Sequence, residues 1–190
     1  MTANERKALI FSVAEGLFGA RGCEKVTMSE IAAQVGMSKR TLYVLFPDKG
    51  ELLKALVASS YIWPEEAFEA GAGDPVAQLR LRLGGMAEHA LSERHVRLCR
   101  LACRECAGTA GLAEAFLDRG IAASRTHLIQ VIETIPKARR KLDLPAPLLA
   151  DMLYGATCGF RLMQALLTGC KPAQAEVEAA IALVMDALFI

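Results

Sequence analysis

Residues 27 to 53, TMSEIAAQVGMSKRTLYVLFPDKGELL, carry the start and stop signals of several short helices. Thr27 and Glu30 have the three-residue spacing of a capping box, in which each side chain bonds the backbone amide of the other residue. Apolar residues then recur at helical spacing until Gly36, which ends the run. We therefore expect a helix of about two turns between Thr27 and Gly36.

The same signals return twice more within this stretch. Ser38 can cap a second helix, and Pro47 ends it. Asp48 and Glu51 have the spacing of another capping box, which begins a longer third helix. Two helices joined by a short glycine-bearing turn are the arrangement of a helix-turn-helix, whose second helix enters the major groove of DNA.

The second helix has two chemically different sides. Leu42, Leu45 and Phe46 recur at helical spacing and are expected to face the core. The opposite side carries basic and hydroxyl groups and no carboxylate, so it would attract a DNA duplex and not repel it. An ordinary corner between two helices would use the same caps, and only the chemistry of this side favours DNA binding over that alternative.

We expect nine residues to lie at the DNA. Hydroxyl and ammonium groups donate to phosphate oxygens, whereas lysine, arginine and threonine can also read base edges. The phosphate contacts are assigned to Thr27, Ser38, Tyr43 and Lys49, the base contacts to Lys39, Arg40 and Thr41 with Val44 as an apolar probe, and Ser29 is placed beside them.

An ordered set of motifs runs through the same stretch. It comprises Ile31-Ala32, Val35-Gly36-Met37-Ser38, Thr41-Leu42-Tyr43, Phe46 and Lys49, preceded by an amphipathic helix from Leu9 to Phe18 that stops at Arg21-Gly22. Together these motifs resemble the N-terminal signature of the TetR family of bacterial transcriptional regulators. The sequence departs from the commonest pattern of that family at Arg40 and at Val44-Leu45, and these positions are where we expect its own operator preference to lie.

The resemblance implies an all-α protein with an N-terminal three-helix helix-turn-helix DNA-binding domain followed by a helical ligand-binding and dimerisation bundle. We expect the first domain to cover residues 1–50 and the second to cover residues 51–190. The resemblance further implies a ligand-responsive repressor that binds a palindromic double-stranded DNA operator as a homodimer. A small-molecule effector is expected to release the operator.

Composition fits a dimeric regulator better than a monomer with a basic tail. Hydrophobic residues make up 53% of the 190 residues, which is high for a soluble monomer and suggests a subunit interface. The net charge is only +1, with seven basic and five acidic residues among the first 50. With no apolar run of about 18 residues and no secretory signal at the N-terminus, we expect a cytoplasmic protein without a membrane span.

The chain beyond residue 74 reads as helices separated by short breakers. We place them at roughly 75–91, interrupted or bent at Gly84-Gly85, and at 93–107, 111–135, 147–168 and 173–189. The junction with the first domain is expected at Tyr61 to Pro64. The basic stretch from Lys137 to Lys141 is interpreted as a solvated loop.

The last two of these helices are expected to form the dimer interface. The apolar residues from Leu148 to Leu167 cover more than one stripe, so one side can pack in the core while the other needs a partner. The final helix carries a seam suited to helix packing, and the last two helices form the interface in the family that the chain resembles. A deep core in a monomer is the alternative. The expected interface residues are Leu149, Met152, Leu153, Phe160, Met163, Leu167, Val177, Ile181, Val184 and Leu188.

The middle helices are where we expect an effector pocket. Its candidate residues, each of which could equally be a core residue, are Trp63, Cys103, Cys106, Phe116 and His127. Cys99, Cys103 and Cys106 also share a helical spacing that could sense oxidants or hold a soft metal, so a thiol- or metal-sensing regulator is the alternative function. Cysteines that serve as small buried hydrophobes are the simpler interpretation.

Enzymatic chemistry has little support in the sequence. Its three histidines, His89, His95 and His127, belong to no zinc-protease motif, and there is no nucleophile elbow or phosphate-binding glycine loop. We therefore expect no enzyme activity, no cofactor and no metal site.

Overall fold

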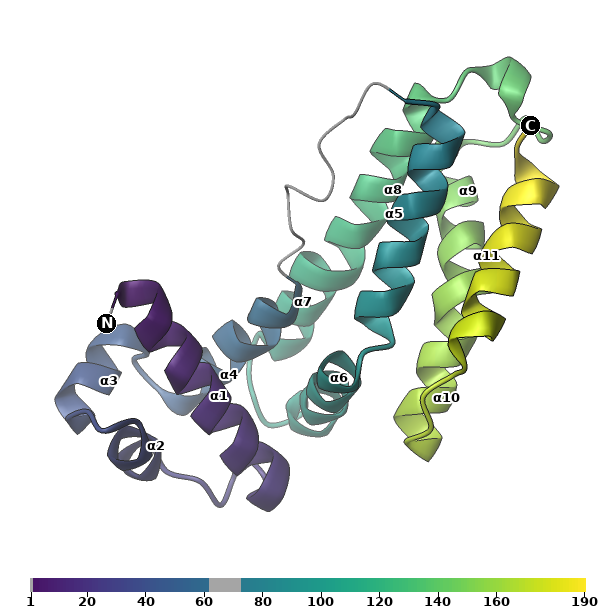
Figure 1. Ribbon diagram of the computed structural model, residues 1–190. Helices are drawn as coiled ribbons and strands as arrows, with labels where there is room; N and C mark the ends of the chain where they lie inside the picture. Colours follow the sequence, from purple (N-terminus) through teal and green to yellow (C-terminus); the bar gives the residue numbers. More distant parts are fainter. Residues whose placement is uncertain (1, 62–72) are drawn as a thin grey trace. The chain divides into compact units, whose positions relative to one another are not determined.

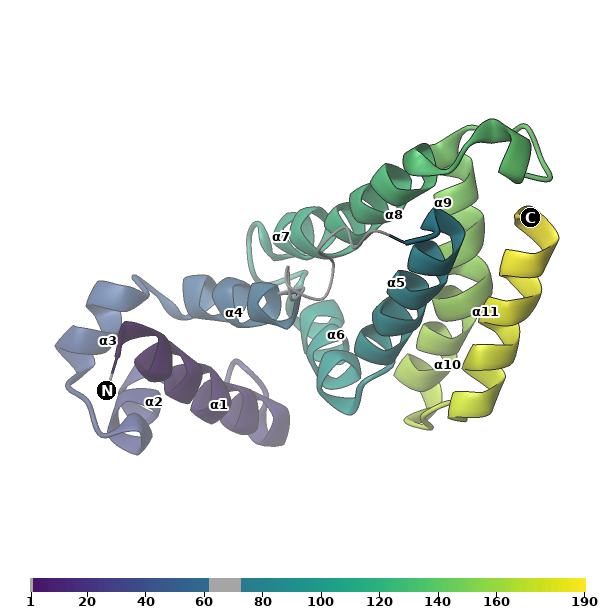
Figure 2. The same ribbon diagram turned by 45° about the horizontal axis from the view of Figure 1, so that its top comes forward.

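The computed structural model describes residues 2–61 and 73–190, and it builds them almost entirely from helices (Figures 1 and 2). Within those two ranges the β-type pairing is limited to one isolated antiparallel bridge between Arg140 and Phe189. The expected all-α class is confirmed. No described helix combines the length and the apolar content needed to cross a membrane.

The described helices follow one another with short connections. They are α1 (Ala3–Arg21), α2 (Met28–Val35), α3 (Lys39–Leu45), α4 (Lys49–Ala58), the 3-10 turn η1 (Ser59–Tyr61), α5 (Pro75–Ala90), α6 (Glu93–Glu105), α7 (Leu112–Phe116), the π-helical turn η3 (Leu117–Ala122), α8 (Ala123–Thr134), the 3-10 turn η4 (Lys137–Arg139), α9 (Ala146–Tyr154), the π-helical turn η5 (Gly155–Gly159), α10 (Phe160–Thr168) and α11 (Gln174–Leu188).

The chain divides into two compact units, and two of the boundaries between them fall inside the helical elements α6 and η3. The first unit comprises the described part of Met1–Ile62 together with Arg97–Arg119, and the second comprises the described part of Trp63–Val96 together with Gly120–Ile190. The C-terminal part of α6 therefore packs with α1 to α4, far from them in the sequence. The expected functional boundary at residue 50 separates α4 from helices with which it packs in the first unit.

One apolar core holds the first unit together. The helices α2 and α3 have only eight and seven residues, which is too short for stability in isolation, so both depend on this core. Its largest buried side chains are Ile10 and Phe18 of α1, Ile31 of α2, Leu42 of α3, Leu52, Leu53 and Leu56 of α4, and Leu98 of α6.

The caps that the sequence predicts in the first unit are present. Thr27 and Glu30 form a complete capping box, and Ser38 accepts the amide of Thr41. Asp48 accepts the amide of Glu51 at 2.8 Å, which is one of the two bonds of the capping box expected there, while the carboxylate of Glu51 pairs with Lys54 at 2.6 Å. Gly36 ends α2 at φ 74°, a left-handed conformation that favours glycine because it has no Cβ.

The second unit is a bundle in which α5, α8, α9 and α11 lie side by side (Figures 1 and 2). Its core is mainly apolar, with Thr157 and Ser124 among its buried polar residues, and its fully buried hydrophobic members include Leu79, Leu83, Leu128, Ile132, Leu149, Leu153 and Cys158. The helix α5 runs without interruption through Gly84 and Gly85, so an interruption there is wrong. A glycine costs a helix only about 1 kcal/mol, and packing against α8 and α11 offsets that cost.

Burial divides the residues expected at the dimer interface. Half of them are wrong as interface residues, because their side chains are buried in the core of the same protomer and have almost no surface to offer: Leu149, Leu153, Val177, Ile181 and Leu188. Val184 packs partly against that core. The other four residues, Met152, Phe160, Met163 and Leu167, are exposed on α9 and α10.

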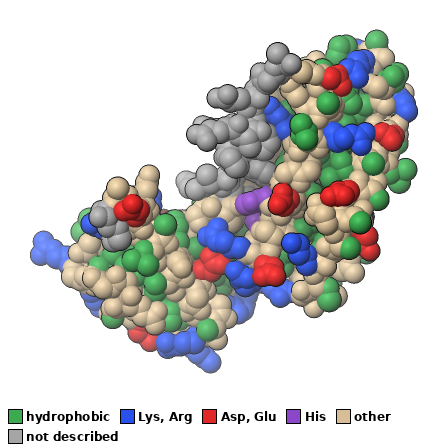
Figure 3. Space-filling model, viewed as in Figure 1, with side chains coloured by type: hydrophobic (Ala, Val, Ile, Leu, Met, Phe, Trp, Pro, Cys, Tyr) green, Lys and Arg blue, Asp and Glu red, His purple; other side chains and the backbone are tan. Residues whose placement is uncertain are grey.

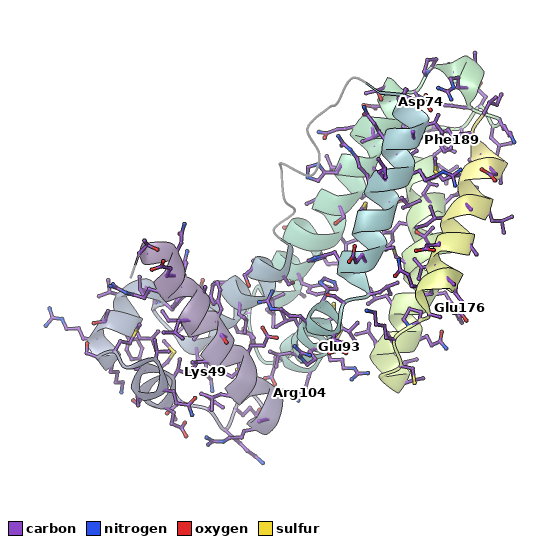
Figure 4. The ribbon with its side chains drawn as sticks, viewed as in Figure 1. Lys49, Asp74, Glu93, Arg104, Glu176 and Phe189 are labelled. Atoms are coloured by element: carbon purple, nitrogen blue, oxygen red, sulfur yellow. The ribbon has the colours of Figure 1, made fainter. Side chains whose placement is uncertain are left out.

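The basic stretch from Lys137 to Lys141 is a structural element, and its interpretation as a solvated loop is wrong for three of its residues. Arg139 pairs with the carboxylate of Asp74 and donates to the carbonyl oxygen of Ile190. Arg140 donates to two carbonyl oxygens at the end of α8, and the ammonium group of Lys141 donates to a carbonyl oxygen of α11. Figure 4 places Asp74 and Phe189 at the same end of the second unit.

Candidate nucleic-acid interface

The rotation of α3 about its axis is fixed by what it buries. Leu42 is fully buried in the core of the first unit, and Phe46, which follows the helix, is buried there too. At the N-terminus the hydroxyl oxygen of Ser38 accepts the amide of Thr41 at 3.1 Å and lies 2.8 Å from the hydroxyl oxygen of Thr41. The opposite side of α3 is therefore held outward.

The outward side of α3 is basic and free of acidic groups. Lys39, Arg40 and Val44 are exposed, and Val44 shows 78% of its surface although it is apolar. The ammonium group of Lys39 lies 5.6 Å from the ring centre of Tyr43, one helical turn away, within the range of a cation–π contact. No carboxylate occurs among the seven residues of α3. Figure 3 shows Lys and Arg side chains along the edge of the first unit where α3 lies.

Leu45 differs from its expected position on the buried side. It is 40% exposed, beside Val44 on a seven-residue helix that buries only Leu42 completely. One turn of a short helix offers room for one or two core positions, and Phe46 occupies the second. Two neighbouring apolar side chains, Val44 and Leu45, are thus partly or wholly open to solvent at the end of α3.

The residues expected to contact DNA from α2 lie at its first turn. Thr27 and Ser29 are both exposed. The hydroxyl group of Thr27 already donates to the carboxylate of Glu30 at 2.9 Å and accepts the amide of Glu30 at 3.2 Å. Thr27 therefore serves first as the helix cap, and a phosphate would compete with Glu30 for its hydroxyl hydrogen.

Lys49 does not have the role expected from the sequence. Its ammonium group donates to the carbonyl oxygens of Cys23 at 2.5 Å and Val26 at 3.0 Å, and it lies 3.4 Å from that of Glu24. An ammonium group has three hydrogens, and these carbonyl groups engage them. The assignment of Lys49 to a DNA phosphate is therefore replaced by a structural role, in which Lys49 ties the start of α4 to the loop between α1 and α2 (Figure 4).

Two further side chains, Arg21 and Glu105, bond the backbone of that loop, residues 22–26. Arg21 donates to the carbonyl oxygen of Lys25 at 3.0 Å, and the amide of Cys23 donates to the carboxylate of Glu105 on α6 at 3.4 Å. Arg104, next to Glu105, donates to the carbonyl oxygen of Phe18 near the end of α1 at 3.3 Å (Figure 4). The sequence offered no sign of the contacts made by α6, because they join residues about 80 positions apart.

Glu30 has the most strongly shifted carboxyl group of this region. Hydrogen bonds from the Thr27 amide, from the Arg21 guanidinium at 2.9 Å and from the Thr27 hydroxyl lower the pKa of Glu30 from 4.5 to about 2. Each of these donors favours the ionised carboxylate. The start of α2 is therefore stabilised by a carboxylate that stays ionised well into the acid range.

The described residues that are expected to line an effector pocket belong to both units. Cys106 and Phe116 pack against the core of the first unit, Cys103 is exposed on α6, and His127 is exposed on α8 in the second unit. Trp63 lies outside the described residues, as does most of the expected junction at Tyr61 to Pro64. Cys106 and Phe116 therefore have the position of core residues, which is the alternative to lining a pocket.

The three cysteines at and beyond the end of α6 do not form a row of equivalent thiols. Cys99 is buried, Cys106 is half-buried and Cys103 is exposed. Burial, with smaller contributions from Cys103 and Glu114, raises the pKa of the Cys106 thiol, which reduces the reactive thiolate form. No group of three or more metal-ligating side chains occurs within the described ranges. These observations give no support to thiol or metal sensing.

The geometry and chemistry of α2 and α3 define a class of protein. Two short capped helices joined by a glycine turn present a second helix with a basic, acid-free outer side, which is the form of a helix-turn-helix DNA-binding protein. Residues 10–56 match the family model for bacterial regulatory proteins of the tetR family. The chain belongs to the TetR family of transcriptional regulators, as its sequence motifs predict.

Known proteins resemble the whole chain as well as its first domain. The HTH-type transcriptional regulator TtgR of Pseudomonas putida is 28% identical over 154 residues, 78% of this chain and 73% of TtgR. A crystal structure assigned to the TetR family, from Mesorhizobium loti MAFF303099, has a TM-score of 0.81 at 20% identity and covers 100% of both chains. The structure of NalD, the secondary repressor of the MexAB-OprM multidrug efflux pump in Pseudomonas aeruginosa, has a TM-score of 0.74 at 19% identity, covering 100% of this chain and 98% of NalD.

The structural role of Lys49 predicts a stability effect in place of a DNA effect. Lys49→Met keeps the apolar stem and removes the charged donor, so we expect the free energy of unfolding to fall by about 1.5–3 kcal/mol. Lys39→Met, at an exposed lysine, should cost less than about 1 kcal/mol. Urea unfolding measures both. Unchanged stability of Lys49→Met together with weaker binding to random duplex would restore the phosphate assignment.

The lowered pKa of Glu30 predicts an acid-dependent contribution to stability. Because the folded-state pKa is below the unfolded value, the contribution is complete above the unfolded pKa of 4.5 and is lost as the pH falls toward 2. The stability difference between the wild type and Glu30→Gln should therefore be constant from about pH 6 to 8 and shrink between pH 4.5 and 2. Denaturant midpoints measured across this range test the prediction, and a difference that does not change with pH would refute it.

Proposed function

We propose that this protein is a ligand-responsive repressor that binds a palindromic operator as a homodimer and releases it when a small-molecule effector binds. The observation that carries the proposal is the exposed, basic and acid-free side of α3, mounted on a core that fixes its rotation. Residues 1–50 supply DNA recognition in this proposal, and residues 51–190 supply effector binding and dimerisation.

The exposed side of α3 supports separate roles for its residues at the operator. Arg40 and Lys39 are exposed on the first turn, where the N-terminal residues of a recognition helix meet base edges. Thr41 and the apolar Val44 complete the base-reading set. Ser38 and Tyr43, with Thr27 and Ser29 from α2, contact phosphates and fix the position of α3 in the groove.

A second copy of the chain is the partner of the exposed apolar residues on α9 and α10. Phe160 and Leu167 expose 73% and 78% of their surfaces, and Met152 and Met163 lie on the same helices. Aromatic residues and methionine are enriched in the buried centres of protein interfaces. Two copies related by a two-fold axis would present two α3 helices to half-sites about 34 Å apart or a multiple of that distance.

Release by an effector requires a ligand that binds one conformation of the protein better than the other. A ligand with equal affinity for the DNA-bound and free conformations would shift nothing, however tightly it bound. The description of NalD as a repressor supports repression as the direction of regulation. A thiol- or metal-sensing regulator, the alternative, gains no support from Cys99, Cys103 and Cys106.

The base-reading role of Arg40 predicts a loss of sequence preference. Arg40→Lys keeps the positive charge and removes the bidentate geometry that suits guanine, so operator affinity should fall by about 1–3 kcal/mol. Affinity for random duplex should change less than about threefold, because the phosphate attraction remains. Fluorescence anisotropy at fixed salt measures both. Equal losses on operator and random duplex would place Arg40 at a phosphate.

The dimer assignment predicts different outcomes for two equally exposed leucines. Leu167 on α10 and Leu81 on α5 expose 78% and 77% of their surfaces. Leu167→Glu places a charge in the proposed interface and should raise the dimer dissociation constant about 100-fold or more, while Leu81→Glu should leave it within about threefold. Sedimentation equilibrium measures both variants. A dimer that survives Leu167→Glu and dissociates with Leu81→Glu would move the interface to α5.

A further inference from the structure

A π-helical turn joins α9 to α10 without breaking the helix. Gly155 (φ −58°, ψ −46°) and Gly159 (φ −57°, ψ −57°) at its two ends keep right-handed helical angles. A π turn has hydrogen bonds between residues five apart, so it holds one residue more than the corresponding α-helical turn. Every residue after it is consequently rotated by about 100° from where a regular α-helix would place it.

The burial pattern shows that rotation. Before the turn, the core side is formed by Ala146, Leu149, Ala150 and Leu153. At α-helical spacing the core positions after Thr157 would include Phe160 and Gln164, yet both are exposed, and Ala165 is buried one position beyond Gln164. After the π turn, the core-facing positions therefore lie one residue later in the sequence than regular α-helical spacing would place them.

Two side chains supply the hydrogen bonds that the widened turn needs. The hydroxyl group of Thr157, fully buried, donates to the carbonyl oxygen of Leu153 at 2.7 Å. Arg161 donates to the carbonyl oxygen of Ala156 at 2.9 Å and, through its other terminal nitrogen, to that of Glu176 on α11 at 3.2 Å. These bonds place two side-chain donors at the turn and tie it to the neighbouring helix α11.

The outward-facing residues of α9, η5 and α10 have a regular spacing when one residue of the π turn is not counted. Leu148, Met152, Gly155, Phe160, Met163 and Leu167 then follow at separations of 4, 3, 4, 3 and 4. This is the heptad spacing of a seam at which two helices pack against each other. Phe160, Met163 and Leu167 therefore continue, after the π turn, the stripe that Leu148 and Met152 begin.

We propose that η5 sets the register of the dimer seam, by absorbing one extra residue and so turning Phe160, Met163 and Leu167 toward a second copy of the chain. The inference rests on the homodimer of the proposed function and adds the element that makes its apolar face continuous. A second copy fits the seam because a two-fold interface brings the same patch from both subunits, and an uncharged stripe can meet its own copy without repulsion. Asp151, beside the stripe, is already paired with Arg125 at 2.6 Å.

The test compares a deletion and an insertion at the same exposed position. Deleting Ala156 should convert the π turn into a regular α-helical turn and leave the seam facing outward, so the dimer dissociation constant should stay within about threefold of the wild type. Inserting one alanine after Ala156 should rotate the seam further and raise that constant about 100-fold or more. Sedimentation equilibrium gives the constants, and circular dichroism gives the helix content.

The outcomes separate this inference from the proposed function. A monomeric wild-type protein would contradict the homodimer itself. A dimeric wild type, with a deletion variant that is folded and monomeric or that loses its helix content, would overturn the role of η5 and leave the homodimer in place. Equal dissociation constants for the deletion and insertion variants would also overturn it.

Discussion

The first unit depends on the burial of α2 and α3, which are too short to be stable in isolation. The proposed recognition helix α3 has seven residues, and its position is set by Leu42 and Phe46, which are buried in a core shared with α1, α2, α4 and α6. Because α6 supplies Leu98, Leu101 and Ala102 to that core, the DNA-reading surface is completed by a helix far away in the sequence. A minimal fragment ending at residue 50 would lack those side chains.

Polar contacts add to the apolar core in holding the helices of the first unit in place. The ammonium group of Lys49 and the carboxylate of Glu105 both bond the loop between α1 and α2, and Glu30 ties the first turn of α2 to Arg21. These groups lie where the chain leads into the helix-turn-helix, in the loop before α2 and at its first turn. The outward side of α3 is therefore left with the residues that do not serve the fold, namely Lys39, Arg40, Tyr43 and Val44.

Features decided by neighbouring residues could be predicted from the sequence. Contacts between residues far apart in the sequence could not. The caps at Thr27, Ser38 and Asp48 were predictable because a helix start is decided within four residues. The partner of Lys49 was not predictable, because the sequence of a lysine beside a DNA-binding helix is the same whether its ammonium group binds a phosphate or three carbonyl groups. Half of the expected dimer residues lie in the core for a related reason. The sequence of an apolar stripe does not reveal whether the stripe faces the core of its own protomer or a second copy, and the five buried residues lie on α9 before η5 or on α11.

Two surfaces thus carry the proposed function, a basic one on α3 and an apolar one on α9 and α10. The most direct test of their combined role is to select, from random duplexes, the DNA that the purified protein retains, and to sequence it. Two α3 helices related by a two-fold axis should retain an inverted repeat whose half-site centres lie about 10–10.5 base pairs apart or a multiple of that distance. Enrichment of a single site without two-fold symmetry, or of no sequence at all, would contradict it.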